Sequence, residues 1–271
     1  MAGFIKTILV IIFIPVFTIA VIATSVKYQL LSPKFWKNTL SQNNVYKDMA
    51  ATVKTLADSK TTKGGGNPRD IKILTDVVTP ELTQDFMEKN ITNILDYANG
   101  KRKDLIAYIP ISKIPKNLAP KSVGLNQEEI PFDSLLSKFN IGQNALPLTQ
   151  IAYFGKAVNY VLVFSYAVSL VIAILLFVLT EKGSRFFSFG LALTLSGILI
   201  AAIVRLLNFA HQNFLSNPVT DSHFGVSILK ILGPLVLSEL LKVWNIVGIT
   251  AIVVGLVFLF LKKPGVRPDH V

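Results

Sequence analysis

Two histidines and one carboxylate near residue 215 have the donor types of a zinc site. They are His211, Asp221 and His223, and imidazole nitrogens and carboxylate oxygens are ordinary Zn²⁺ ligands. The 12-residue step between the two histidines is neither a helical nor a zinc-finger spacing, and the sequence contains no H-E-x-x-H. A solvated loop is the favoured interpretation, so we assign no metal ligand.

Other residues of chemical interest also lack the neighbours that their chemistry needs. The triplet Gly64–Gly66 lacks the following Gly-Lys-Ser/Thr of a phosphate-binding loop. A nucleophilic serine needs a base and an orienting partner, yet there is no G-x-S-x-G, and the third histidine is the distant His270. Asn90 begins a formal glycosylation sequon in the middle of a helical pattern. We assign no catalytic and no cofactor-binding residue and expect a non-enzymatic protein.

The elements that would carry these residues are mostly apolar helices. Charged residues make up 16% of the chain, against about 25% in a typical soluble protein. The charge is missing from four runs, which contain 20, 24, 19 and 19 uncharged residues. About 20 apolar residues cross the hydrocarbon core of a bilayer as a helix. The sequence therefore predicts a mainly α membrane protein, a bundle of four transmembrane helices.

The first of these runs also resembles a signal peptide, with Met1–Lys6 as its basic start and Ala20–Ala23 near a cleavage site. Its apolar part is longer than the usual 7–15 residues, and no A-x-A site precedes Lys27. We expect an uncleaved anchor helix and keep cleavage as the alternative.

A mostly helical domain is expected between the first and second runs. Its best helix begins at Thr79-Pro80 and ends at Gly100, because a cap followed by proline starts a helix and glycine stops one. Seven apolar residues form one stripe of this helix: Leu82, Phe86, Met87, Ile91, Ile94, Leu95 and Ala98. Five polar residues lie largely on the other side: Gln84, Asp85, Glu88, Thr92 and Asp96.

The rest of this domain flanks that helix. Ser32-Pro33 and Asn43-Asn44 open two earlier helices, the second with Val45, Met49 and Val53 at helical spacing. After Gly100 the chain is extended and rich in proline, with room for short strands and a short helix near Asp133–Phe139. The basic triplet Lys101–Lys103 is interpreted as a supplement to the helix cap, because its positive charge complements the negative C-terminal end of the helix.

The segment 226–242 carries one thin polar stripe on an apolar helix, from Ser227, Lys230, Ser238 and Lys242. Such a helix can lie in the headgroup plane of a membrane or pack under the outer domain. The alternative is a continuous helix, kinked at Gly233-Pro234, that runs into the last span. We favour the interfacial helix.

Short loops decide orientation, because basic residues stay in the cytoplasm. With both termini inside, the short cytoplasmic pieces hold six basic residues: Lys6, Lys182, Arg185, Lys262, Lys263 and Arg267. The predicted order is a cytoplasmic N-terminus 1-6, span 7-26, extracytoplasmic domain 27-156, span 157-180, turn 181-185, span 186-206, outer loop 207-242 with the interfacial helix 226-242, span 243-261 and cytoplasmic tail 262-271.

The charge excludes some partners. The net charge of +11 is spread along the chain, whereas nucleic-acid binding needs a clustered basic face. We therefore expect no nucleic acid as a partner, and interpret the surplus of lysine as a solubility feature or an attraction to anionic lipid headgroups. The chain has no cysteine, so disulfides and thiol chemistry are excluded.

Small residues recur at four-residue spacing in three spans, as Ser169/Ala173, Gly197/Ala201 and Ala251/Gly255. Such pairs let helix backbones approach closely. They fit packing within one bundle better than dimerisation, and the oligomeric state stays open. Arg205 lies at the outer end of the third span, where its side chain can reach the interface.

Five stretches of the first domain together resemble a loosely defined group of uncharacterised bacterial multi-pass membrane proteins. These stretches are Leu31–Trp36, Asn44–Tyr46, Val78–Leu82, Asn90 and Leu95–Gly100. The group has an N-terminal span, a helical outer domain and three further spans. The resemblance covers most of the chain and implies the bacterial cell membrane, but it carries no known activity and no site residues.

These patterns together favour a non-enzymatic protein of the cell envelope. Its extracytoplasmic helical domain is expected to bind a membrane or envelope protein as a scaffold, adaptor or sensor, while the lipid bilayer surrounds its spans. The alternative is a subunit or accessory factor of a transporter or channel for a solute or lipid. The absence of an ionisable residue near the centre of any span speaks against ion-coupled transport.

Overall fold

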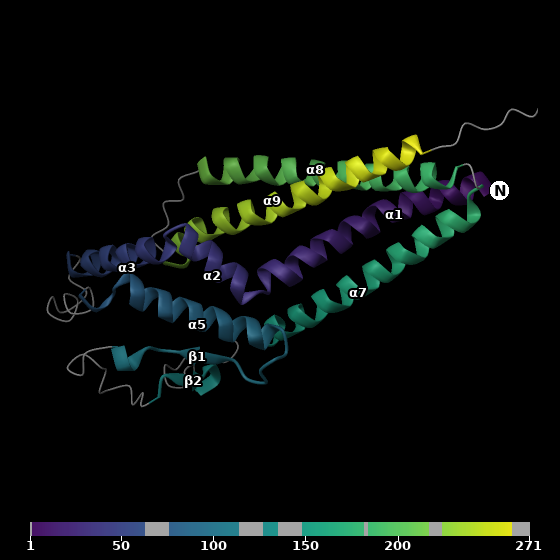
Figure 1. Ribbon diagram of the computed structural model, residues 1–271. Helices are drawn as coiled ribbons and strands as arrows, with labels where there is room; N and C mark the ends of the chain where they lie inside the picture. The colour runs from purple at the N-terminus through teal and green to yellow at the C-terminus, as the bar shows by residue number, and fades with distance from the viewer. Residues whose placement is uncertain are drawn as a thin grey trace, which may run out of the picture. The chain divides into compact units, whose positions relative to one another are not determined.

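The described part of the chain is mostly helical and also contains one small sheet (Figure 1). The computed structural model describes residues 2–62, 76–113, 127–134, 148–181, 184–216 and 224–261. The helices are α1 (Ala2–Ser25), the π-helical turn η1 (Val26–Leu30), α2 (Pro33–Gln42), α3 (Val45–Thr62), α5 (Pro80–Ala98), the 3₁₀ turn η2 (Ile111–Lys113), α7 (Leu148–Leu179), α8 (Arg185–Ser216) and α9 (Phe224–Phe260).

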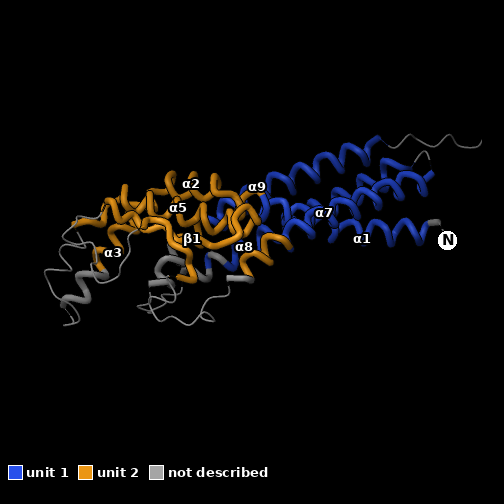
Figure 2. The backbone as a smooth tube through the Cα atoms, turned by 90° about the horizontal axis from the view of Figure 1, so that it is seen from below, with its two compact units in different colours: residues 1–27, 157–221, 236–271 blue, residues 28–156, 222–235 orange. Residues whose placement is uncertain are grey.

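The chain divides into two compact units, coloured separately in Figure 2. Unit 1 comprises residues 1–27, 157–221 and 236–271, and unit 2 comprises residues 28–156 and 222–235. Unit 2 thus contains the chain between the first two candidate spans together with the start of α9. The helices α7 and α9 contribute residues to both units.

Four helices are long and apolar enough to cross a membrane: Gly3–Leu30, Gln150–Leu179, Arg185–Ala210 and Leu232–Phe260. The described residues thus contain four candidate spans by length and composition, the same number as the uncharged runs predict. Most of these helices extend beyond the runs, because a lysine does not end a helix. Lys156 and Lys242 are both exposed residues within helices, on α7 and α9.

The segment before the last span requires a correction. We expected an interfacial helix over 226-242, separate from a span over 243-261, but α9 is one helix from Phe224 to Phe260 with Pro234 inside it. Leu232 and Leu235 pack against a cluster of buried residues in α2 and α3. Protein therefore covers part of the apolar side that we had assigned to the membrane surface. The backbone follows the alternative of a continuous helix.

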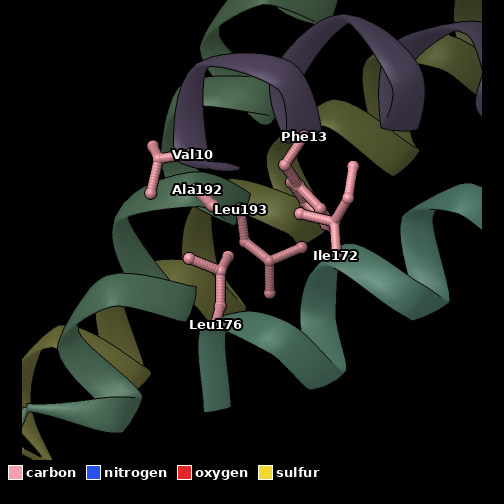
Figure 3. Packing of buried hydrophobic residues seen from close by; sticks show 6 residues of the cluster. All are labelled: Val10, Phe13, Ile172, Leu176, Ala192 and Leu193. Carbon is pink, nitrogen blue, oxygen red and sulfur yellow. The ribbon is translucent and has the colours of Figure 1, made fainter. Parts of the chain in front are cut away.

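Unit 1 is a bundle in which α1 packs against α7 and α8. One apolar cluster joins these helices, and Figure 3 shows its side chains converging between the ribbons. Its buried members are Val10 and Phe13 of α1, Ile172 and Leu176 of α7, and Ala192 and Leu193 of α8. A second cluster joins α1, α8 and α9 through Val21, Ile200, Val204, Leu241 and Trp244.

The ring of Phe189 connects α8 with all three other helices of the bundle. Its centroid lies 6.0 Å from that of Phe13 in α1, 5.8 Å from Phe177 in α7 and 5.6 Å from Phe258 in α9. Aromatic pairs at such separations contribute beyond the area they bury.

The helices α8 and α9 approach each other through glycines. A Cβ atom placed on Gly197 would lie 2.6 Å from the carbonyl oxygen of Gly248, and one on Gly190 would lie 2.6 Å from that of Gly255. The spacing is seven residues on both helices, so the two pairs lie on one face of each, two turns apart. Gly197 and Gly255 therefore serve packing within the chain, as the sequence predicted.

The outer faces of unit 1 are apolar. Tyr160 and Phe164 of α7 are 76% and 71% exposed, and Phe260 of α9 is 85% exposed. A bundle in water carries polar residues on the face away from its core, whereas lipid tails solvate apolar side chains. The exterior therefore agrees with the length and composition of the four helices.

Unit 2 is built around α5, whose ends follow the predicted signals. The Thr79 side chain accepts a hydrogen bond from the Leu82 N–H at 3.2 Å, and Pro80 occupies the first turn. At the other end Gly100 has φ of 72°, and the N–H of Lys101 donates to the Asp96 carbonyl at 2.8 Å. This is the Schellman pattern that a glycine stop produces.

A two-stranded antiparallel sheet completes unit 2. Strand β1 (Ile106–Tyr108) pairs with β2 (Glu129–Pro131), with Ala107 opposite Ile130. Backbone hydrogen bonds from Ile109 to Glu128 and from Phe132 to Leu105 extend the pairing. Short strands were therefore correctly expected after Gly100. The short helix expected near Asp133–Phe139 lies mostly outside the described residues, as does the Gly64–Gly66 loop.

We predict that Gly255→Ala destabilises the bundle by about 1–3 kcal/mol, the usual cost of overpacking a tight interface. A Cβ there would lie 2.6 Å from the Thr194 backbone nitrogen and 2.7 Å from the Gly190 carbonyl oxygen. Thermal denaturation of the full-length protein in detergent measures the effect. Gly3→Ala is the control, because nothing lies within 4 Å of its new Cβ. Equal melting temperatures for the two variants would contradict the glycine contact.

Candidate functional site

Helix α5 is the central element of unit 2, with partners on two sides. On one side Met87 and Ile91 pack on a cluster of Leu40, Val45, Tyr46 and Met49 from α2 and α3. On the other side its polar residues hold β1. The predicted apolar stripe is therefore only partly buried: Leu95 and Ala98 are buried, but Phe86 and Ile94 are 45% and 39% exposed. Those two residues correct the sequence prediction.

A carboxylate on α5 binds groups from the sheet region. Asp85 Oδ2 accepts a hydrogen bond from the Tyr108 hydroxyl at 2.7 Å and lies 2.9 Å from Lys113 Nζ. Lys89 Nζ lies 3.5 Å from Asp85 Oδ1 and 3.8 Å from the Tyr108 ring centroid. The hydrogen bond from Lys113 holds the pKa of Asp85 below its usual value, while burial raises the pKa of Tyr108.

These shifts define what the cluster can do chemically. A general acid or base works best when its pKa lies near the working pH. Here both shifts move the groups away from neutrality, so Asp85 stays ionised and Tyr108 stays protonated. The arrangement fits a clamp that holds β1 and η2 to α5.

Asn90 supports the same clamp with its amide. Its Nδ2 donates to the Tyr108 carbonyl at 2.8 Å, and its Oδ1 accepts from the Tyr108 N–H at 2.9 Å. The same Nδ2 also donates to the Phe86 carbonyl at 2.8 Å. The nitrogen that a sequon would glycosylate is thus engaged twice, which favours a structural role for Asn90.

A second carboxylate joins α5 to α2 and α3. Glu88 Oε1 accepts hydrogen bonds from the Tyr46 hydroxyl at 3.1 Å and from Gln84 Nε2 at 2.8 Å. Lys37 Nζ lies 3.5 Å from Glu88 Oε2. Burial, followed by the bond to Glu88, raises the pKa of Tyr46 well above its usual value. Tyr46 is therefore a fixed donor at neutral pH.

The C-terminal end of α5 meets the ends of two span helices within unit 2. Asn99 Nδ2 donates to the Leu31 carbonyl at 2.9 Å, just after η1, and Trp36 Nε1 donates to the Leu30 carbonyl at 2.7 Å. At the start of α7, a Cβ on Gly155 would lie 1.8 Å from the Ala98 carbonyl oxygen. We call this meeting point, made by Leu30, Leu31, Ala98, Asn99 and Gly155, the α5 junction.

No protein-family model, curated protein or solved structure matches the chain. The resemblance described above therefore stays a prediction from the sequence.

The described residues do not include the side chains of the zinc site considered in the sequence analysis. The backbone of His211 lies in α8, but its side chain lies outside the described part, as do Asp221, His223 and His270. Within the described part, no group of three His, Asp or Glu side chains could hold a metal ion. Arg205 is described and is exposed on α8.

Sequence reasoning missed the partners of the α5 carboxylates. Tyr108 and Lys113 follow α5 in a proline-rich stretch without periodicity, and no spacing rule links them to Asp85. It also missed that Trp36 and Asn99 cap the carbonyls after the first span. The carbonyls at a helix end always need donors, and that requirement was the available signal.

We predict that Asp85→Asn lowers the stability of the protein at neutral pH and that the difference from the wild type shrinks in acid. The pKa of Asp85 is depressed in the folded state. Its contribution to stability is therefore present above the ordinary carboxyl pKa of about 4 and is lost as the pH falls below that value. Thermal melts at neutral and strongly acidic pH measure this. A difference independent of pH would contradict the assigned role.

Proposed function

We propose that this chain is a non-enzymatic integral membrane protein of the cell envelope whose unit 2 lies outside the cytoplasm and binds another envelope or membrane protein. Both termini are cytoplasmic in this proposal. The six basic residues on the short loops and ends support that orientation. The four apolar helices support the anchoring role.

The observation that carries the proposal is the filled interior of unit 1. Two apolar clusters and the glycine contacts of α8 and α9 occupy the space between the described parts of its helices. A solute path needs polar groups or water at that position. The buried hydroxyls of Ser169 and Thr194 make no hydrogen bond in the described part of the chain. Two isolated hydroxyls do not form a polar path, so the interior fits an anchor better than a channel.

The surface of α5 supports partner binding. Phe86 and Ile94 expose much of their side chains two turns apart, and the partly exposed Lys89 stands between them along the helix. Exposed apolar residues framed by charge are typical of protein interaction surfaces. The polar contacts of Asp85, Glu88 and Asn90 hold α5 rigid behind this surface.

The way in which binding would act also follows from the chain. The predicted cytoplasmic pieces are short, so a signal would pass to another membrane protein rather than to a cytoplasmic domain. Helix α5 contacts the residues next to the first two spans at the α5 junction. A change at α5 therefore has a direct route to those residues.

We predict the orientation with a single introduced cysteine, because the chain has none of its own. A cysteine replacing Lys103 is expected to react with an impermeant maleimide on intact cells. A cysteine replacing Ser184 is expected to react only after the cells are permeabilised. The reverse pattern would place unit 2 in the cytoplasm and overturn the proposal.

We also predict that a photoreactive amino acid at Phe86 or Ile94 forms a discrete crosslink to another protein in cells. The matched control is the same amino acid at Leu95, which is 8% exposed on the same helix and is expected to give no such adduct. Mass spectrometry identifies the adduct. Crosslinks to lipid alone, or the same products from all three positions, would contradict a protein-binding surface on α5.

A further inference from the structure

The α5 junction brings together chain segments that carry basic and aromatic residues. Asn99 is hydrogen-bonded to Leu31, and Gly155 touches the Ala98 carbonyl. The residues that flank these contacts by only a few positions therefore share one region of unit 2. The basic and strongly exposed aromatic residues among them are Tyr28, Lys101, Arg102, Lys103, Tyr153, Phe154 and Lys156.

The aromatic members of this group are strongly exposed. Tyr28 is 67% exposed, Tyr153 70% and Phe154 51%. Unit 2 buries other aromatic side chains, such as Tyr46 and Tyr108. Exposed tyrosines with an apolar ring and a polar hydroxyl are typical of the boundary between lipid headgroups and hydrocarbon.

The group has four basic members, and two carboxylates, Asp96 and Asp104, lie beside them in the sequence. Lys101 Nζ lies 3.2 Å from Asp96 Oδ1, in agreement with the predicted supplement to the helix end. Among the described residues, no carboxylate lies within ion-pairing distance of Arg102, Lys103 or Lys156. This leaves cationic groups available for an anion from outside the protein.

The ends of the candidate spans indicate how deep these residues lie relative to the membrane surface. The first candidate span ends at Leu30 and the second begins at Gln150. Lys156 immediately precedes the uncharged run of α7 and lies six residues after Gln150, a rise of only about 9 Å along the helix. The side chain of Lys156 therefore starts close to the edge of the apolar segment, where lipid phosphates lie.

We propose that this basic and aromatic surface, which we call the junction patch, binds the phosphate groups of anionic phospholipids. The inference rests on the membrane embedding in the proposed function and adds a ligand class to it. Lys and Arg supply charge-assisted hydrogen bonds to phosphate oxygens, and the aromatic rings pack against the glycerol and upper acyl region. We expect the phosphate of a lipid rather than free inorganic phosphate, because only a lipid also contacts the aromatic rings and the adjoining spans.

The test uses the full-length protein reconstituted in vesicles of equal parts phosphatidylcholine and phosphatidylglycerol. Spin-labelled versions of each lipid report the motionally restricted lipid at the protein surface. Their ratio gives the selectivity for the anionic headgroup. We expect the wild type to prefer phosphatidylglycerol.

The decisive variant is Lys103→Gln with Lys156→Gln, which removes one charge from each of two segments of the junction patch. Its control is Lys47→Gln with Lys54→Gln, which removes the same charge from α3. A basic group at a membrane surface contributes about 1 kcal/mol, or about fivefold in affinity. Because two such groups are removed, the selectivity is expected to fall by about 25-fold in the junction variant and to persist in the control.

Three results would overturn the assignment: no preference in the wild type, equal losses in both variants, or displacement of the lipid by inorganic phosphate at constant ionic strength. The restricted spectral component itself tests the membrane embedding separately. If it is present without selectivity, only the junction patch is wrong. If it is absent for every lipid, the proposed membrane anchoring fails as well.

Discussion

Shape complementarity between helices is the constraint on which unit 1 depends. Lipid tails solvate an apolar side chain on the surface of a helix bundle about as well as its interior does. Burial of apolar side chains alone therefore does not hold the spans together. The glycines of α8 and α9 meet this constraint, because they let the two backbones approach until a Cβ would collide with a carbonyl oxygen. The hydroxyl of Thr194 lies against Gly255 in the same contact, where a Cα–H group can serve as a weak donor. The ring of Phe189 then fixes α8 to the three other helices.

Unit 2 is held together in a different way, by an apolar core and by directional polar contacts. Its core of Leu40, Val45, Tyr46 and Met49 excludes solvent, while the opposite side of α5 works through carboxylates and an amide. One helix therefore has an apolar attachment and a polar attachment. The polar attachment is directional, so it specifies the position of β1 in a way that apolar packing alone does not.

The sequence predicted the features that depend on local physics. The absence of charge located four apolar helices, and Thr79, Pro80 and Gly100 located both ends of α5, because caps and glycine stops act within a few residues. Segment 226-242 was assigned incorrectly because its polar stripe resembles that of an interfacial helix. The residues that cover Leu232 and Leu235 belong to α2 and α3, about 190 residues earlier in the chain, so no local pattern indicates them. The same limit applies to Asp85, whose partners Tyr108 and Lys113 are defined only by tertiary structure. Gly190 and Gly248 were overlooked because the search was for pairs four residues apart rather than seven.

The small sheet has a consequence for self-association. A strand edge with free N–H and C=O groups is a template on which another chain can add a strand. On β1 the outward N–H and C=O of Tyr108 are already taken by Asn90. On β2 the outward position opposite Ile106 is Pro131, which has no N–H to offer. Both margins of the sheet are thus interrupted at a key position, so two strands suffice here without inviting a third from a neighbouring molecule.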